Sequence, residues 1–262
     1  MTRKNEQNNP LENVGKLLLE LNLTTVAKEL SALLTQAEST HPGYSEFLES
    51  ILKTECEARS ERKILRRTRF SKLGPPVSLD HFNYAVRPQL SPQVIKELLT
   101  CRFINERRNL VLVGRPSTGK TTVARAIGHA ACQRGLSVYN VALADALAML
   151  YAGRADGTYQ KVLRRLKQPD LLILDDCGFD TQLGADGANE LFRLVATRYL
   201  QRSMIVVTNL PFKQWGEFLP SPAHAIAIAD RLIDQATILR FSGKPYRLPR
   251  DIHGAPLDGE DE

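Results

Sequence analysis

A glycine-rich segment at residues 114–121 carries the residue types best suited to bind a polyphosphate. Its sequence, Gly-Arg-Pro-Ser-Thr-Gly-Lys-Thr, fits the pattern G-x-x-x-x-G-K-[ST] at every fixed position and follows the apolar run 110–113. In a strand–loop–helix of this kind, backbone N–H groups surround the phosphates, the lysine reaches the β- and γ-phosphates and the hydroxyl ligates Mg²⁺. We therefore expect a nucleotide site formed by Gly114, Arg115, Pro116, Ser117, Thr118, Gly119, Lys120, Thr121 and Thr122.

Two carboxylates follow a later apolar run. Residues 171–174 are Leu-Leu-Ile-Leu, and Asp175 and Asp176 come directly after them. Open parallel sheets bind ligands at the carboxyl ends of their strands, so a buried strand can deliver both acids to the phosphate loop. We expect Asp175 to join Thr121 as a Mg²⁺ ligand and Asp176 to orient or deprotonate the attacking water, as in a P-loop ATPase. The alternative is a pair of surface acids that cap a turn.

Three further polar residues are candidates with less specific patterns. The apolar run 204–208 ends at Asn209, whose amide can reach the γ-phosphate or the attacking water; asparagine also favours turns, and an Asn-Leu-Pro turn begins here. Arg231 can stabilise developing phosphate charge, in its own chain or in a neighbouring subunit, or it can pair with Asp230 or Asp234 on a helix surface. Arg247 is ambiguous in the same way.

The elements that must position these residues form an α/β domain behind a helical one. Apolar runs at 110–113, 138–142, 171–175 and 204–208 alternate with helical patterns, which predicts a parallel sheet covered by helices on both faces. Before residue 72 the apolar residues recur at helical spacing. We expect a small all-helical N-terminal domain at 1–72 that binds DNA or a partner, an α/β domain at 73–254 and an acidic disordered tail at 255–262.

Basic residues recur along the last N-terminal helix. They lie at spacings of three and four residues, which is one helical face and suits the regular phosphates of a duplex. Such contacts give affinity without sequence choice, and the lack of interleaved aromatic residues argues against stacking on single strands. The alternative is a solvated face balanced by nearby glutamates. The candidates are Arg59, Arg62, Lys63, Arg66, Arg67 and Arg69; a second cluster comprises Lys161, Arg164, Arg165 and Lys167.

Composition narrows the class of protein. The formal net charge of +6 over 262 residues is weak evidence for a nucleic-acid partner by itself. No apolar run approaches the roughly 20 residues that span a bilayer, and the polar N-terminus lacks the apolar region of a signal peptide. The four cysteines are scattered without metal-ligand spacing, so free thiols are expected. We expect a cytoplasmic protein with no membrane partner.

The ordered set of motifs resembles the IstB-type ATPases, helper proteins of bacterial insertion sequences, and more distantly the DnaC helicase loader, within the AAA+ superfamily. The resemblance covers roughly residues 10–250, and its later motifs are more specific than the phosphate loop, which many ATPases share. The markers are Asn-Leu-Val-Leu-Val-Gly at 109–114, the loop 114–121, Asp-Leu-Leu-Ile-Leu-Asp-Asp-Cys-Gly at 170–178, Arg-Tyr at 198–199, Thr-Asn at 208–209, Phe-Lys-Gln-Trp at 212–215, Asp-Arg-Leu at 230–232 and Tyr-Arg-Leu at 246–248.

The resemblance implies an AAA+ P-loop core and roles for matching positions. Lys120 and Asp176 would be catalytic, Asn209 the sensor asparagine, and Arg231 an arginine finger acting on ATP in an adjacent subunit of a homo-oligomer; Arg247 would be a second sensor that binds the nucleotide. The implied function is an ATP- and Mg²⁺-dependent ATPase that assembles on double-stranded DNA and assists a cognate transposase. The alternative function is a replicative helicase loader of the DnaC type.

Two positions depart from the pattern of the superfamily. Ser117 stands where these loops usually carry glycine, so the loop has less conformational freedom. Asp176 stands where most AAA+ enzymes have glutamate, and its shorter side chain positions water less well. We therefore expect slow ATP hydrolysis, stimulated by DNA or by self-assembly.

Overall fold

The computed structural model describes residues 9–79, 82, 84, 90–178 and 183–242. The chain divides into two compact units, residues 1–66 and 67–262. Helix α3 (Tyr44–Ser71) continues from the first unit into the second, and the predicted division after residue 72 falls just beyond its end. The predicted acidic tail and Arg247 lie outside the described residues. Among the described helices, none has both the length and the apolar character needed to cross a membrane.

The first unit consists of α1 (Pro10–Glu20), α2 (Thr24–Thr40) and most of α3. Asn9 caps α1 by accepting a hydrogen bond from the N–H of Leu11, and Pro10 occupies the first helical position, where its missing N–H costs nothing. His41 ends α2 in the left-handed conformation, with φ of 46°. The helical N-terminal region predicted from the apolar spacing is thus confirmed.

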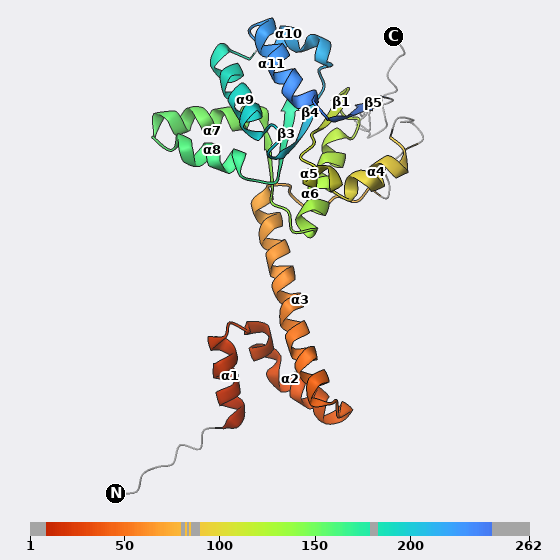
Figure 1. Ribbon diagram of the computed structural model, residues 1–262, viewed down its shortest axis with the longest axis vertical. Helices are drawn as coiled ribbons and strands as arrows, with labels where there is room; N and C mark the ends of the chain where they lie inside the picture. Colours follow the sequence, from red (N-terminus) through yellow and green to blue (C-terminus); the bar gives the residue numbers. More distant parts are fainter. Residues whose placement is uncertain (1–8, 80–81, 83, 85–89, 179–182, 243–262) are drawn as a thin grey trace, which may run out of the picture. The chain divides into compact units, whose positions relative to one another are not determined.

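The second unit is built on one five-stranded sheet in the order β2-β3-β4-β1-β5, with every adjacent pair parallel (Figure 1). Four strands match the predicted apolar runs, and β5 was not predicted. The strands are β1 (Leu110–Gly114), β2 (Val138–Ala142), β3 (Leu171–Cys177), β4 (Ser203–Thr208) and β5 (Thr237–Phe241).

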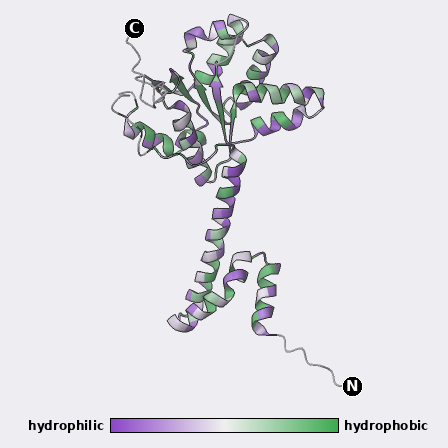
Figure 2. Cartoon of the chain, turned by 180° about the vertical axis from the view of Figure 1, so that it is seen from behind, coloured by the Kyte–Doolittle hydropathy of each residue, from purple (hydrophilic) through white to green (hydrophobic). Residues whose placement is uncertain are grey.

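Helices cover both faces of this sheet, which confirms the predicted α/β P-loop fold. Alternate residues of the strands face opposite sides: Leu112 and Ile173 belong to the core under α4 and α6, while Val111 and Leu172 belong to the core under α7, α8, α9 and α11. The strands are accordingly the most hydrophobic part of the unit in Figure 2. The helices are α4 (Pro92–Leu99), α5 (Arg102–Asn105), α6 (Lys120–Gln133), α7 (Leu143–Ala155), α8 (Tyr159–Lys167), α9 (Ala185–Arg198), α10 (Trp215–Phe218) and α11 (Pro222–Ile233), with the 3-10 turn η1 (Phe212–Gln214).

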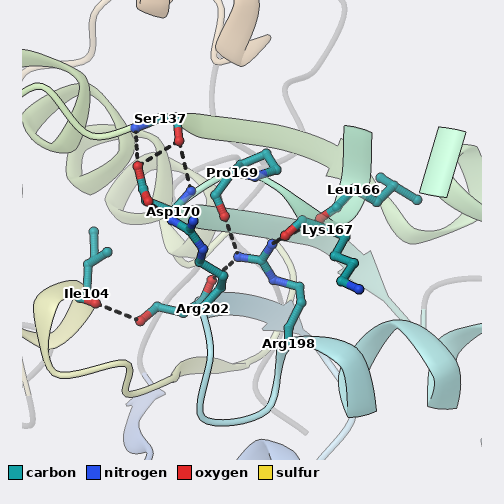
Figure 3. A network of polar contacts seen from close by, with 9 residues as sticks. Ile104, Ser137, Leu166, Lys167, Pro169, Asp170, Arg198 and Arg202 are labelled. Atoms are coloured by element: carbon teal, nitrogen blue, oxygen red, sulfur yellow. Dashed lines mark hydrogen bonds and ion pairs between the residues drawn. The ribbon is translucent and has the colours of Figure 1, made fainter. Parts of the chain in front are cut away.

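A buried arginine fixes where β3 and β4 begin (Figure 3). Arg198 is 0% exposed, and its guanidinium donates hydrogen bonds to four carbonyl oxygens. These belong to Leu166 and Lys167 at the end of α8, to Pro169 before β3, and to Ser203 at the start of β4, at 2.7–3.0 Å. Burial lowers the pKa of Arg198 to about 9. The arginine therefore sets the starting points of the two strands whose far ends carry Asp175, Asp176 and Asn209.

The segment that follows α3 lies against α6. Leu73 is 1% exposed and packs where α6 has Gly128: a Cβ added at Gly128 would meet Leu73 Cδ2 at 2.6 Å. The carbonyl of Pro75 accepts a hydrogen bond from Arg125 Nη2 at 3.3 Å and lies 3.1 Å from His129 Nε2. The backbone after α3 is thus attached to the helix that begins at the phosphate loop.

Candidate nucleotide site

The loop predicted to bind phosphate lies beside the carboxyl ends of β3 and β4. A pocket of about 520 Å³ is lined by residues 116–122 of this loop together with Asp175, Asp176 and Asn209. The parallel sheet brings these segments together because β1, β3 and β4 all end at the same edge. Five of the residues predicted for catalysis and metal binding therefore share one cavity: Lys120, Thr121, Asp175, Asp176 and Asn209.

Lys120 is held inside the loop by backbone oxygens. Its Nζ donates hydrogen bonds to the carbonyls of Gly114, at 2.6 Å, and Arg115, at 2.7 Å. The side chain is only 8% exposed, and burial lowers the pKa of Lys120 although the negative charges of Asp175 and Asp176 oppose this shift. A phosphate group can replace the two carbonyls, and its negatively charged oxygens accept stronger hydrogen bonds from the ammonium than neutral carbonyls do.

Thr121 and Asp175 supply two oxygens at a separation that suits Mg²⁺. The Thr121 hydroxyl donates to Asp175 Oδ1 at 3.2 Å. Adjacent ligands of an octahedral Mg²⁺ lie roughly 3 Å apart, because each stands about 2.1 Å from the ion. Burial and the neighbouring Asp176 raise the pKa of Asp175, and a bound cation would favour its ionised form. Asp175 is 8% exposed, so it is not a surface acid.

Asp176 reaches the same pocket because the strand is irregular there. Successive strand residues point to opposite faces, which would carry Asp176 away from the side of Asp175. The pairing of β3 with β4 shifts between Leu174 and Cys177, and Asp176 has a left-handed φ of 53°. Its N–H donates to Asp175 Oδ1 at 3.0 Å, and its side chain is exposed. A bulge of this kind redirects a side chain at a functional site.

Asn209 has a polar side-chain atom to which none of the described residues bonds. Its Oδ1 is buried and has no hydrogen-bond partner among the described residues. The turn after β4 depends instead on Thr208, whose hydroxyl accepts from the N–H of Leu210 at 3.1 Å and donates to the carbonyl of Cys177 at 2.6 Å. A buried unsatisfied oxygen in a pocket is a position for a water or a substrate group.

Comparison with known proteins assigns the family. The model of the family described as "IstB-like ATP binding protein" matches residues 16–253. The chain belongs to this family. One similar relative is described as the ATP-binding protein of insertion sequence IS5376 from Geobacillus stearothermophilus; it is 32% identical over 90% of this chain and 94% of the relative. Another is described as the ATP-binding protein of insertion sequence IS21 from Pseudomonas aeruginosa; it is 31% identical over 88% of this chain and 87% of the relative. The predicted ATP site thus lies in a member of an ATP-binding family.

Solved structures of AAA+ proteins share the fold of this IstB-like protein. The AMPPCP-bound DnaA of Aquifex aeolicus has a TM-score of 0.53 and 23% identity, over 65% of this chain and 51% of the DnaA chain. The DnaI structure has a TM-score of 0.51 and 19% identity, over 65% and 90%. This chain therefore spans about half of that DnaA and most of that DnaI chain.

Two pocket residues of the IstB-like protein were not predicted. Ser78 and Phe82 come from the stretch between α3 and α4, where the sequence predicted no site residue, yet both line the pocket. The Phe82 ring is 8% exposed and tilted against Tyr84, with ring centres 5.1 Å apart. An aromatic face beside a phosphate loop can pack against a nucleobase. No motif in the sequence marks these residues, because a single aromatic residue in a proline-rich stretch has no characteristic spacing.

Arg231 lies away from the pocket of its own chain. The side chain of Asn109, just before β1, donates to the carbonyl of Arg231 and accepts from the N–H of Met204 at the start of β4. The backbone of Arg231 is therefore near the edge where the strands begin, and from Met204 at that edge β4 runs roughly 17 Å to Asn209, at about 3.3 Å per strand residue. Arg231 is not among the described residues that line the pocket.

The predicted basic face of α3 is partly occupied. Arg59 and Arg62 both bind Oε1 of Glu55, at 3.1 and 2.8 Å, and Glu55 is 2% exposed. Burial would raise the pKa of Glu55, but hydrogen bonds from the N–H groups of Thr25 and Val26 and from the two arginines lower it overall. Arg59 and Arg62 thus hold α2 and α3 together, and the candidates that stay exposed without an ion pair in the described residues are Lys63, Arg66 and Arg69.

Ser117 adopts the backbone conformation that its position usually reserves for glycine. Its φ is 59°, and a left-handed non-glycine residue costs about 1–2 kcal/mol. Replacing Ser117 by glycine is expected to raise the free energy of unfolding by about 0.5–1 kcal/mol, because glycine removes this cost but adds entropy to the unfolded chain. Urea unfolding followed by the fluorescence of the single tryptophan, Trp215, measures the change.

The control for this prediction is Gln160→Gly. Gln160 is exposed in α8, where φ is helical, so glycine there should lower the free energy of unfolding by about 0.5–1 kcal/mol. Ser117→Val should be less stable than the natural protein, since a β-branched residue tolerates left-handed backbone poorly. A Ser117→Gly protein less stable than the natural one would contradict the assigned strain.

Proposed function

We propose that this protein is an ATP-dependent DNA-binding ATPase that assembles on duplex DNA and assists a transposase in moving an insertion sequence. The proposal rests chiefly on the distribution of its ATPase residues. The phosphate loop, the two aspartates and Asn209 gather in one pocket, whereas Arg231 lies at the opposite edge of the sheet. An ATP site that lacks its arginine is completed when a second copy supplies it.

Each pocket residue has a role in hydrolysis under this proposal. Lys120 binds the β- and γ-phosphate oxygens, and Thr121 and Asp175 hold Mg²⁺, which supplies positive charge against the phosphates. Asp176 orients the attacking water and accepts its proton, while the free Oδ1 of Asn209 accepts a hydrogen bond from that water. The carboxylate of Asp176 is exposed on a bulge, so its distance to the water is loosely fixed and turnover is slow.

ATP then controls assembly. An arginine that faces the γ-phosphate of the next copy binds most strongly while that phosphate is present, so ATP favours association and hydrolysis favours release. The exposed cations of α3 and of α8 supply contacts to DNA phosphates. The relatives carry insertion-sequence names, which supports a transposase as partner rather than a helicase. Use of ATP and DNA, together with the free thiols of the four cysteines, supports a cytoplasmic location for this activity.

A DNA-binding measurement tests the proposal. The full chain should bind a duplex tightly with ATP and Mg²⁺ and at least tenfold more weakly without ATP, because association of copies adds contacts along the DNA. The bound form should capture an insertion-sequence transposase and leave a replicative helicase in solution. Equal affinity with and without ATP, or capture of the helicase alone, would contradict the proposed function.

Charge variants locate the DNA contacts in the same assay. The double variant Lys63→Gln/Arg66→Gln should weaken DNA binding. It should also reduce the steepness of the slope of log affinity against log salt concentration by about 2, since each lost phosphate contact contributes about 0.9 to that slope. Arg59→Gln is the matched control. The guanidinium of Arg59 binds buried Glu55, so its loss should destabilise the helical unit while the slope against salt concentration changes little. An unchanged slope in the double variant would exclude the α3 face as a DNA contact.

A further inference from the structure

The side chain of Arg231 rests on an aromatic ring. Its guanidinium carbon lies 5.0 Å from the centre of the Phe192 ring, and its Nη1 donates to the carbonyl of Ala227 at 2.9 Å. Phe192 belongs to α9, which packs beside α11 (Figure 1), and it contacts the core beneath these helices. Packing against the core therefore holds Phe192 in place, while the face of its ring contacts the guanidinium of Arg231. Aromatic faces attract cations.

Within the part of the chain that the structure describes, no carboxylate forms an ion pair with this arginine. Asp230 and Asp234 are its nearest acids in the sequence, yet neither forms an ion pair with it in the described structure. Asp234 instead accepts a hydrogen bond from the hydroxyl of Tyr199, one residue beyond α9. The alternative in which Arg231 pairs with an acid on its own helix is therefore wrong for this structure, and the full positive charge is available to another group.

The backbone beneath Arg231 is fixed independently. Asn109 Nδ2 donates to the carbonyls of Arg231, at 3.4 Å, and Leu232, at 3.2 Å, and Leu232 is 1% exposed. The last turn of α11 thus keeps its place without Phe192. The ring therefore affects only the direction in which the guanidinium points. The arginine side chain has four rotatable bonds, so holding it in one direction costs a large rotamer entropy.

We propose that Phe192 is a positioning residue for Arg231. Its ring directs the guanidinium without neutralising it, so the arginine meets the γ-phosphate of a neighbouring copy without first breaking an ion pair. The inference rests on the proposed function, in which Arg231 acts between copies. A carboxylate in the place of the ring would orient the arginine equally well but would compete with the phosphate for its charge.

Steady-state ATP hydrolysis by the full chain, with duplex DNA present, tests the role of the ring. Phe192→Leu should lower kcat about 5- to 30-fold, the range of cation–π interactions from exposed to desolvated sites, and should leave the affinity for an ATP analogue within twofold. Phe192→Tyr keeps the aromatic face and should restore kcat to within about twofold. Phe192→Met fills the same space without a ring and replaces the leucine variant if that variant unfolds at lower temperature.

A double-mutant cycle separates positioning from a merely structural role. If Phe192 acts through Arg231, then Phe192→Leu should cause no further loss of kcat in an Arg231→Ala protein. The inference is overturned by an unchanged kcat in Phe192→Leu, by failure of tyrosine to rescue, or by an additional loss in the double variant. An Arg231→Ala protein with normal kcat is a distinct result, since it would refute the proposed action of Arg231 itself.

Discussion

Replacing Lys120 by alanine is expected to lower the affinity for ATP by a factor of about 10² to 10³. The ammonium group can donate charge-assisted hydrogen bonds to the β- and γ-phosphates, and two such bonds contribute roughly 3–4 kcal/mol, or two to three factors of ten. The bonds that Lys120 makes to the carbonyls of Gly114 and Arg115 show that its amine already points into the loop. Calorimetric titration with ATP and Mg²⁺ measures the change.

Lys161→Ala is the matched control for this experiment. Lys161 is an exposed lysine of α8, outside the pocket, and its loss changes the net charge by the same amount. The control should bind ATP as the natural protein does, and both variants should unfold as the natural protein does when followed by Trp215 fluorescence. If Lys120→Ala bound ATP within threefold of the natural protein, the loop at 114–121 would not be the ATP site.

Arg231→Ala is expected to lower kcat by about 10³-fold or more while the affinity of an unassembled copy for ATP stays unchanged. An arginine finger stabilises charge that develops on the transferred phosphoryl group, and its removal costs 10³- to 10⁵-fold in related chemistry. Because Arg231 does not line the pocket of its own chain, it adds nothing to ATP binding there. Hydrolysis of ATP at saturating concentration, with duplex DNA present, measures the loss.

Mixing two inactive variants tests whether the arginine acts between copies. Lys120→Ala copies keep Arg231 but do not bind ATP, and Arg231→Ala copies bind ATP but lack the arginine. If the site is shared, the mixture should hydrolyse ATP although neither protein does so alone. The rate should rise with the number of contacts in which a Lys120→Ala copy presents Arg231 to an Arg231→Ala copy. A mixture as inactive as its components would contradict an action between copies, and so would an Arg231→Ala protein that is active alone.

The sequence predicted the three central strands of the sheet and the edge strand β2, but missed β5 at the opposite edge. A central parallel strand is buried on both faces, so β1, β3 and β4 read as uninterrupted apolar runs. In β5 only Leu239 and Phe241 are buried, and Thr237 and Arg240 are exposed. This alternation with polar residues over five positions resembles many loops and short helices, so periodicity alone did not identify the strand.

The positions of the candidate site residues followed from the sheet, but their detailed geometry did not. Asp175 lies near the end of β3 and Asn209 directly follows β4, and the common edge of a parallel sheet places them together. The left-handed backbone of Asp176 depends on a shift in strand pairing, which involves residues distant in sequence. Likewise, helical spacing put Arg59 on a basic face but gave no sign that Glu55 on that face is buried.

The attachment of the post-α3 segment to α6 has a mechanical consequence. The same helix carries Lys120 at its first residue and contacts Leu73 and Pro75 near its other end, through Gly128 and His129. Fourteen helical residues span about 21 Å and behave as a stiff rod. Because Leu73 is in van der Waals contact with Gly128, α6 cannot tilt unless the segment that follows α3 moves with it. The phosphate loop and the residues that follow α3 are therefore joined to one stiff helix, at two points along its length.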